Sequence, residues 1–332
     1  SACRAGIQPF QRVCSSKTKD LRSSNRTTRE DVRVRRLPIL TIAWMSICLA
    51  VWADTTASPP AAAPETFTLW QLPNQTSVQM MSYVVQTPKG SLLVIDGGNA
   101  GDAPCLRELI LNHGGNVTAW IITHVHSDHV NALTEILKDP GAITIGTLYG
   151  SIPGREWVAA HAGEVEQTEY DAFMAALAQS GRQVSELSIG QRLTFDSVNI
   201  LVLGIKNPEI TANPINNSSI AFRLWDATKS VLFTGDLGPE GGEKLLNSDQ
   251  ARHLPADYVQ MAHHGQKGVS EAFYAAVNPS FCLWPTPKWL WDNDNGGGPG
   301  SGPWKTLEVR AWMDKLAIKR HYCMHEGLHE IR

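Results

Sequence analysis

The sequence lacks any cysteine pattern that would define its fold. Only six of its 332 residues are cysteines, and three of these, Cys105, Cys282 and Cys323, lie beyond residue 53. No two cysteines have C-x-x-C spacing, which excludes the common thiolate zinc-binding pattern. Cys282 and Cys323 fall in strand-like runs and could pair in an oxidising compartment; the alternative is three unpaired core thiols.

Most of the chain has no excess of basic over acidic residues. The first 53 residues hold 10 of the 29 Lys and Arg but only 3 of the 32 Asp and Glu, so the remainder carries a net charge of −10. Nucleic-acid binders usually show a basic footprint, and an acidic domain is repelled by polyphosphate at long range. We therefore expect a small-molecule substrate and do not expect long nucleic acid as a partner.

No uncharged run is long enough for a typical membrane span. The run that begins at Leu37 is about 15 residues long, whereas a spanning helix needs roughly 20. It follows Arg33, Arg35 and Arg36 and ends near Val51-Trp52-Ala53, the order of a secretory signal peptide. We expect a secreted or periplasmic protein without a membrane span after cleavage; an uncleaved N-terminal anchor is the alternative.

The composition divides the chain into four parts. Residues 1–31 have no periodicity and no Met, and we interpret them as a non-native or disordered extension, with the true start near Val32. Residues 32–53 form the predicted signal peptide. Residues 54–65 are rich in Ala, Pro and Thr and read as a linker. Residues 66–332 form the predicted main folded domain.

Helices and strands alternate through this last part, which favours one layered α/β sandwich over two separate domains. The residue patterns predict strands and helices in turn. The expected strands are 67–72, 80–86, 91–95, 117–123, 143–148, 191–195, 198–203, 219–225, 230–234, 258–261 and 281–284. The expected helices are 105–113, 131–137, 164–178, 241–246 and 270–277, and Pro285 to Pro303 reads as a long Gly-rich loop.

The densest group of metal-binding side chains follows the strand at 117–123. His124, His126, Asp128 and His129 place three imidazoles and a carboxylate within six residues. Imidazole and carboxylate ligands suit zinc, manganese and iron. In turning backbone, one such loop can serve two adjacent metal ions, so we expect a metal site here rather than a His-rich surface loop.

Two further candidate ligands also follow apolar strands. Asp236 ends the run Leu232-Phe233-Thr234-Gly235-Asp236, where Gly235 would allow a close backbone approach, and an Asp there could bridge two metals. His263-His264-Gly265 follows the strand at 258–261, and we expect at least one of this pair to be a ligand.

Together these residues resemble the metallo-β-lactamase superfamily. His124-Val125-His126-Ser127-Asp128-His129 fits its signature motif, and Asp96-Gly97-Gly98 fits its early strand end. The runs Asn216-Asn217-Ser218-Ser219, Phe233-Thr234-Gly235-Asp236 and His263-His264-Gly265 are similar to the branch of competence-type DNA-uptake proteins and phosphorylcholine esterases.

The resemblance implies a four-layer αββα sandwich with two divalent ions, zinc in the first place and manganese as the alternative. His124 and His126 would hold one ion; Asp128, His129 and His264 would hold the other, with Asp236 bridging. A metal-bound hydroxide would be the nucleophile. Asp128 and His263 are the candidate catalytic residues, and His263 could contact the oxyanion or protonate the leaving group.

The sequence departs from the superfamily pattern at the first ion. Many members supply a third histidine from a strand before the bridging Asp, yet the region around Leu203–Asn207 has none, and His161 is the one histidine between His129 and His253. Asn216, Asn217 or water could take that place, and a mononuclear site stays open.

We expect hydrolysis of a small phosphodiester, such as a phosphorylcholine-type ester or a cyclic nucleotide. Candidate substrate-binding residues are Asn217 and Ser218, which could instead form a plain turn, and Trp289 and Trp291, which could instead pin the Gly-rich loop. The alternatives are a β-lactam or lactone hydrolase, a DNA-directed nuclease related to DNA uptake, and a non-catalytic binding domain.

Overall fold

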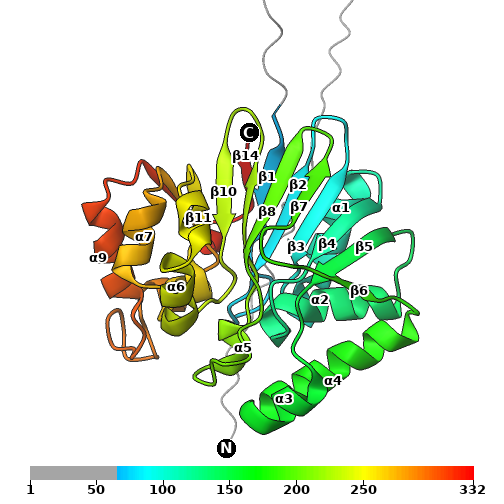
Figure 1. Ribbon diagram of the computed structural model, residues 1–332, viewed down its shortest axis with the longest axis horizontal. Coiled ribbons are helices and arrows are strands. Elements are labelled where there is room, and N and C mark those ends of the chain that lie inside the picture. The colour runs from blue at the N-terminus through cyan, green and yellow to red at the C-terminus, as the bar shows by residue number, and fades with distance from the viewer. Residues whose placement is uncertain (1–65) are drawn as a thin grey trace, which may run out of the picture. The chain divides into compact units, whose positions relative to one another are not determined.

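The computed structural model describes residues 66–332, and the expected extension, signal peptide and linker lie outside the described residues. Two seven-stranded sheets lie face to face, with helices on their outer faces (Figure 1). This is the predicted αββα sandwich, so the fold prediction is confirmed.

The first sheet has the order β14-β1-β2-β3-β4-β5-β6. Pairing is antiparallel from β14 to β3 and parallel from β3 to β6. Its strands are β1 (Thr68–Gln71), β2 (Ser82–Gln86), β3 (Leu92–Asp96), β4 (Asn116–Ile121), β5 (Thr144–Gly150), β6 (Val184–Glu186) and β14 (His329–Ile331).

The second sheet has the order β13-β12-β11-β10-β9-β8-β7. Its strands are antiparallel from β7 to β10 and parallel from β10 to β13. They are β7 (Arg192–Phe195), β8 (Val198–Gly204), β9 (Ala221–Trp225), β10 (Ser230–Phe233), β11 (Tyr258–Gln260), β12 (Phe281–Trp284) and β13 (Arg320–Cys323).

Helices cover the outer face of each sheet. α1 (Ala103–Asn112), α2 (Ser127–Lys138), α3 (Arg155–His161) and α4 (Glu164–Gln179) lie beside β3, β4 and β5 (Figure 1). α6 (Pro239–Leu246), α7 (Glu271–Val277) and α9 (Thr306–Lys315) lie on the other side, beside β10 and β11. Short turns complete the chain: α5 (Pro214–Asn217), α8 (Lys288–Trp291), η1 (Ala100–Asp102), η2 (Asp249–His253), η3 (Ala262–Gly265) and η4 (Met324–Glu326).

The layers follow from strands that are apolar on both faces. In β3, Leu93 and Ile95 enter the core between the sheets, whereas Leu92 and Val94 face the helices. Successive side chains of a strand point to opposite faces, so a strand buried on both sides reads as an unbroken apolar run. These runs made the inner strands recognisable in the sequence.

Several elements differ from the sequence-based expectations. Helix α2 begins at Ser127, earlier than the expected 131, because its first turn carries the polar residues Asp128 and His129, which break the apolar period. The expected loop at 285–303 contains α8, and β13 and β14 follow it. Cys282 and Cys323 are free thiols on neighbouring strands, which agrees with the alternative that they are unpaired core thiols. Burial raises the pKa of Cys323 to about 12.

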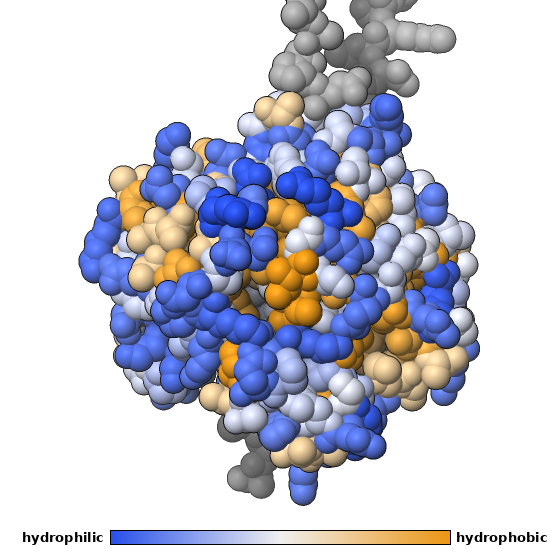
Figure 2. All heavy atoms as spheres, in the orientation of Figure 1, coloured by the Kyte–Doolittle hydropathy of each residue, from blue (hydrophilic) through white to orange (hydrophobic). Residues whose placement is uncertain are grey.

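Apolar side chains at the surface are scattered. Figure 2 shows hydrophilic residues over most of one face, interrupted by small hydrophobic groups. The large apolar residues most exposed to solvent are Val78, Leu111, Val165, Ile189, Leu307 and Leu328. Within residues 66–332, no helix has both the length and the apolar character needed to cross a membrane.

Candidate metal centre

The predicted metal ligands converge because each follows the end of an inner strand. β3 ends at Asp96, β4 leads into residues 124–129, β10 leads to Asp236, and β11 leads to His263 and His264. β3 and β4 are parallel, as are β10 and β11, so within each pair the carboxyl ends share one edge of their sheet. That edge is where layered α/β folds present functional groups.

Four of the predicted ligands form one compact group: Asp128, His129, Asp236 and His264. One ligand atom from each lies within 4.8 Å of the others. His264 Nε2 is 3.1 Å from Asp128 Oδ2 and 3.2 Å from Asp236 Oδ2, and His129 Nε2 is 3.3 Å from Asp236 Oδ1. All four residues are buried, and the two imidazoles are fully so. We call this group the four-ligand half of the centre.

Both imidazoles of this half are oriented from behind. His129 Nδ1 lies 2.7 Å from Asp96 Oδ2, and His264 Nδ1 lies 2.8 Å from the carbonyl oxygen of Pro285. A proton on each Nδ1 leaves the Nε2 lone pair directed at the carboxylates. This arrangement is typical of metal-ligating histidines.

Asp96 is itself held rigidly. Its Oδ1 accepts the Thr123 amide at 2.7 Å, and its Oδ2 accepts the Thr123 hydroxyl at 2.6 Å. The sequence pattern predicts a strand end at this Asp-Gly pair but assigns no role to the carboxylate. The structure places it behind His129, as the residue that orients this imidazole.

The electrostatics of the four-ligand half fit a divalent cation. Burial opposes charge on every member, yet the coulombic pull of His264 and His129 holds the pKa of Asp236 well below its usual range. Conversely, burial lowers the pKa of His264, but Asp236 and Asp128 outweigh it and raise the pKa to about 9. Without a cation, the carboxylates therefore keep an extra proton on the imidazole. A bound metal would replace that proton.

One atom of this half is left without a hydrogen-bond donor. Among the described residues, Asp236 Oδ1 is buried and has no hydrogen-bond partner. His129 Nε2 lies 3.3 Å from this oxygen. A buried carboxylate oxygen in that position is costly unless a cation lies beside it. The donor set therefore fits a divalent metal ion.

His124 and His126 form a second, smaller group, which we call the two-histidine half. His124 Nε2 and His126 Nδ1 are 3.0 Å apart, so both rings direct a nitrogen to one point. The His124 ring lies 4.0 Å from the His129 ring, which makes the two halves adjacent. Burial, followed by the charge of His129, holds the pKa of His124 well below its usual range, so His124 stays neutral as a ligand must.

The two-histidine half has support from α4 but no third ligand of its own. Glu166 Oε1 lies 3.1 Å from His126 Nε2, on the side of the ring away from His124. In the described part of the chain, no His, Cys, Asp or Glu joins His124 and His126 in a separate compact group. His161 is exposed at the end of α3. The missing third histidine is thus a feature of the fold as well as of the sequence.

The residues of the Asn-rich run at 216–219 have different roles. Asn217 is fully buried, and its Oδ1 accepts the amides of Gly238 and Gly241 while its Nδ2 donates to the Ala212 carbonyl and to Glu240. It ties α5 to the start of α6 and has no atom left for a substrate. That arrangement differs from the substrate-binding role expected for it.

Its neighbours have unused polar atoms instead. Asn216 Nδ2 lies 3.2 Å from His263 Nε2. Within residues 66–332, Asn216 Oδ1 and Ser218 Oγ are buried without a hydrogen-bond partner. Ser219 Oγ accepts the Asp236 amide at 3.0 Å. Of this run, Asn216 is the residue that the structure brings to the histidine pair.

His263 lies in strained backbone beside the centre. Both His263 and His264 have positive φ, of 50° and 54°, a region that non-glycine residues rarely adopt. Gly265 follows at φ 75°, where a Cβ would lie 2.4 Å from the Trp284 ring. His263 Nδ1 lies 3.0 Å from the Lys267 carbonyl, and burial lowers its pKa. His263 is therefore neutral, with Nε2 directed at Asn216.

The two predicted aromatic residues lie in different surroundings. Trp291 packs on Trp284, with ring centroids 5.0 Å apart, and Arg310 stacks on its outer face at 4.1 Å. It anchors the Gly-rich segment to the core. Trp289 is half-buried, packs against Trp304 with the rings tilted by 60°, and donates to the Ser77 carbonyl at 2.8 Å. Through residues 77–79 it borders the centre.

Gln79 reaches the centre from that same segment. Its Nε2 donates to Asp128 Oδ2 at 3.0 Å, and its Oε1 accepts from Gln266. Sequence reasoning missed Gln79 and Glu166, because neither has a distinctive spacing from the ligand-rich loop. Each becomes visible only when distant segments of the chain pack together.

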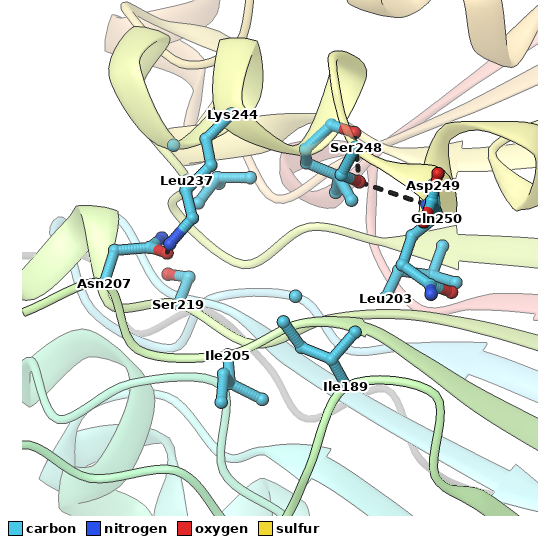
Figure 3. A pocket seen from close by; sticks show the side chains of 13 residues that line it. Ile189, Leu203, Ile205, Asn207, Ser219, Leu237, Lys244, Ser248, Asp249 and Gln250 are labelled. Carbon is cyan, nitrogen blue, oxygen red and sulfur yellow. Dashed lines mark hydrogen bonds between the residues drawn. The ribbon is translucent and has the colours of Figure 1, made fainter.

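A cavity of about 250 Å³ is lined by the residues shown in Figure 3. Its walls are mostly apolar and include Leu203, Ile205 and Leu237, and Ser219 lines it from the side that bonds to Asp236. None of the predicted metal ligands lines this cavity. It is therefore not the chamber in which metal chemistry would occur.

The chain is 26% identical to ComE operon protein 3 of Bacillus subtilis strain 168 over 166 residues, which is 50% of this chain but 19% of that protein. Solved structures with similar folds include the metallo-beta-lactamase fold protein YhfI from Bacillus subtilis, at 14% identity and a TM-score of 0.49, covering 80% of this chain and 100% of that chain. Another is a diphosphatase from the PhnP family, at 13% identity and a TM-score of 0.46, covering 80% and 97%.

A family model provides the assignment. The model described as the metallo-beta-lactamase superfamily matches residues 77–274, a stretch that contains every member of the four-ligand and two-histidine halves. The match spans more than half of the chain, and the chain therefore belongs to the metallo-β-lactamase superfamily.

Proposed function

We propose that this protein hydrolyses a small phosphodiester with the help of divalent metal ions. Members of the superfamily are generally metal-dependent hydrolases. The observation that carries the proposal is the buried four-ligand half directly beside His124 and His126. Divalent ions, when bound there, would supply Lewis-acid stabilisation of the attacked group and activation of water.

The chain's own residues fix the geometry of that reaction. Asp96 and the Pro285 carbonyl hold the rings of His129 and His264, so their Nε2 atoms need not reorganise. Glu166 does the same for His126. Preorganised groups of this kind lower the barrier because they do not have to move as charge develops.

Asn216 and His263 would contact the substrate. Asn216 Nδ2 can donate to a phosphoryl oxygen, and it already lies 3.2 Å from His263 Nε2. His263 is neutral with its proton on the Lys267 side, so Nε2 can take up a proton and later release it to a leaving oxygen. Gln79 would restrain Asp128 from the opposite side.

Two features support a small phosphodiester as the substrate. Adjacent positions for two cations suit phosphoryl transfer, since they can neutralise both the attacking and the leaving oxygen. The charge of −10 beyond residue 53 disfavours a long polyanion, which it would repel.

We further propose that the protein is exported to the periplasm or the medium. The basis is the basic run at 33–36 followed by the uncharged run up to Ala53. Sequencing of the N-terminus of the exported protein should give Asp54 or a neighbouring residue. An intact N-terminus in the membrane fraction would favour the anchor instead.

Turnover of bis(p-nitrophenyl) phosphate tests the catalytic proposal. The protein loaded with zinc or manganese should hydrolyse this diester, and Asp236→Ala should not. Asp314→Ala, which removes an exposed carboxylate on α9, is the matched control and should behave as the parent. No turnover by the folded, metal-loaded parent would contradict the phosphodiester proposal and would favour a lactam or lactone substrate.

A further inference from the structure

A second group of metal-ligand side chains lies near the C-terminus, away from the centre. Cys323 ends β13, and His325 and Glu326 follow in the η4 turn. One ligand atom from each of the three lies within 4.8 Å of the other two. Thiolate, imidazole and carboxylate are all ligands that zinc accepts.

The sulfur of Cys323 is buried and unpartnered. The residue is 2% exposed. Within residues 66–332, no hydrogen bond involves its Sγ, whereas Cys282 Sγ contacts Met313 Sδ at 3.6 Å. Both cysteines are buried on adjacent strands, but of the two only Cys323 has ligand atoms of an imidazole and a carboxylate within 4.8 Å of its sulfur.

His325 is oriented as metal-bound histidines are. Its Nδ1 lies 3.1 Å from the carbonyl oxygen of Thr286, and its ring packs against Trp291 at 5.7 Å. This repeats the arrangement at the centre, where His264 Nδ1 faces the carbonyl of the preceding residue, Pro285. A backbone carbonyl behind one ring nitrogen fixes the tautomer and directs the other nitrogen outward.

His329 supports the group from β14. Its Nε2 lies 2.8 Å from the Cys323 carbonyl and 3.7 Å from Glu326 Oε2. It therefore braces both the backbone of the cysteine and the side chain of the glutamate. Four residues of the run 323–329 thus converge on one turn.

We propose that Cys323, His325 and Glu326 form a second metal site, which binds a zinc-class divalent ion with water completing the coordination. Zinc–sulfur bonds are about 2.3 Å long, and zinc–nitrogen or zinc–oxygen bonds are about 2.0–2.2 Å long. The three ligand atoms, which lie within 4.8 Å of one another, therefore need to approach by only a small distance to share one ion. The site contains a thiolate, whereas the centre has only imidazole and carboxylate ligands. The two sites are therefore distinguishable by spectroscopy, and the proposal does not depend on the proposed function.

An ion in this site would brace the loop behind the centre. Thr286 connects to both sites, because its carbonyl faces His325 and its hydroxyl donates to the His264 carbonyl at 2.7 Å. Binding would restrain residues 285–286 and hence the acceptor of His264 Nδ1. We therefore assign the site a structural role, with a gain in thermal stability on metal binding.

Cobalt titration of the full chain tests the proposal. The parent for this experiment carries Cys3→Ser, Cys14→Ser and Cys48→Ser, so that only the three cysteines beyond residue 53 remain, and it is kept reduced. Cobalt bound to a thiolate shows ligand-to-metal charge-transfer absorption, which imidazole and carboxylate ligands do not give. We expect this absorption to saturate with one equivalent of site-bound cobalt.

Four variants assign the absorption. Cys323→Ser should abolish it, and Cys105→Ser and Cys282→Ser should retain it. Glu326→Gln, which keeps the thiol and the core intact, should weaken cobalt binding by about tenfold or more, as loss of metal partners does. Its result decides the question if Cys323→Ser does not fold. No charge-transfer absorption in the folded, reduced parent, or full absorption in Cys323→Ser, would overturn the proposal.

A last variant separates this site from the centre. Asp236→Ala should keep the charge-transfer absorption even where it removes phosphodiester turnover. Absorption that disappears in Asp236→Ala would place the cobalt–thiolate signal outside the turn at 323–326 and would overturn the assignment.

Discussion

The two halves of the metal centre differ in the number of ligands that the chain supplies. In the four-ligand half, two imidazoles and two carboxylates lie within 4.8 Å of one another, and a fixed acceptor holds each ring. In the two-histidine half, His124 and His126 face each other at 3.0 Å, and Glu166 supports one ring. Both halves begin in the same loop after β4, yet only one receives ligands from the second sheet.

From this difference we expect the second sheet to determine metal affinity. Asp236 and His264 follow β10 and β11, and they complete the half that already contains Asp128 and His129. Nothing equivalent from β8 reaches His124 and His126. We therefore expect one ion to bind tightly and a second to bind weakly, with substrate or water as part of its coordination.

The largest effect should come from loosening the complete half at Asp96. Asp96→Asn removes the acceptor of His129 Nδ1 but suits the backbone, because Asn tolerates the positive φ of 54° found there. We expect metal affinity to fall by about 10–100-fold, as it does when outer partners of ligating histidines are replaced. Competition with a chelator of known affinity measures it.

The control for this change is Asp314→Asn, an exposed site on α9. An Asp96→Asn protein that folds and binds the tight ion as the parent does would show that the ring of His129 needs no support from behind.

A smaller effect should come from the incomplete half. Glu166→Gln weakens the contact to His126 Nε2, and we expect the weak ion to bind about tenfold less tightly while the tight ion is unaffected. Glu164→Gln, an exposed change on the same helix, is the matched control. Loss of the tight ion instead would mean that the halves are not independent.

The sequence anticipated much of this centre, and the reasons are physical. Ligands that lie within six residues of one another, such as His124 to His129, can be recognised by their spacing. Strands buried on both faces can be recognised by unbroken apolar runs. The fold and the ligand-rich loops were therefore predictable. Asp236 and His264 also follow apolar strands, which made them candidates.

The supporting residues could not be predicted in the same way. Glu166 lies 40 residues from His126 in the chain, and Gln79 lies 49 residues from Asp128, so only tertiary packing brings each pair together. Asn217 illustrates the reverse error, because the same polar residue type serves as a loop anchor with every side-chain hydrogen bond used internally. Residue type alone does not separate these cases.

The pH dependence of stability should reverse when the complete half is filled. The neighbours Asp236 and Asp128 raise the pKa of His264 to about 9 in the metal-free protein, against about 6.5 in an unfolded chain. A raised pKa contributes stability that is present below about 6.5 and is lost as pH rises through 9. Thermal unfolding should therefore show the metal-free protein becoming less stable over this window.

The metal-loaded protein should not lose stability there, because the ion replaces the proton and binds more tightly as protons are removed. A metal-free protein that becomes more stable between these pH values would contradict the charge arrangement described for His264.

The smallest effect concerns a carboxylate outside the centre that the chain itself satisfies. Asp226 accepts hydrogen bonds from Phe67, Thr228 and Lys229; burial raises its pKa, but these bonds outweigh burial and bring the pKa to about 2. Its contribution is present above about pH 4 and is lost as pH falls through 2. Asp226→Asn should cost about 1 kcal/mol at neutral pH and should remove this acid dependence.

Denaturant unfolding at pH 7 and pH 3 measures that change. Metal affinity should stay as in the parent. Asp226 would then be a carboxylate that affects stability alone, in contrast to Asp236. A loss of bound metal in Asp226→Asn would show that the turn at 226–229 reaches the centre after all.

The metal content of the protein after extensive dialysis tests the central claim most directly. Parent protein reconstituted with zinc should retain one tightly held ion at the centre when the 323–326 turn is disabled by Glu326→Gln, and Asp236→Ala in the same background should retain none. A second ion should appear only when free zinc is present. Equal retention in the presence and absence of Asp236 would contradict the assignment of Asp128, His129, Asp236 and His264 as the metal-binding half.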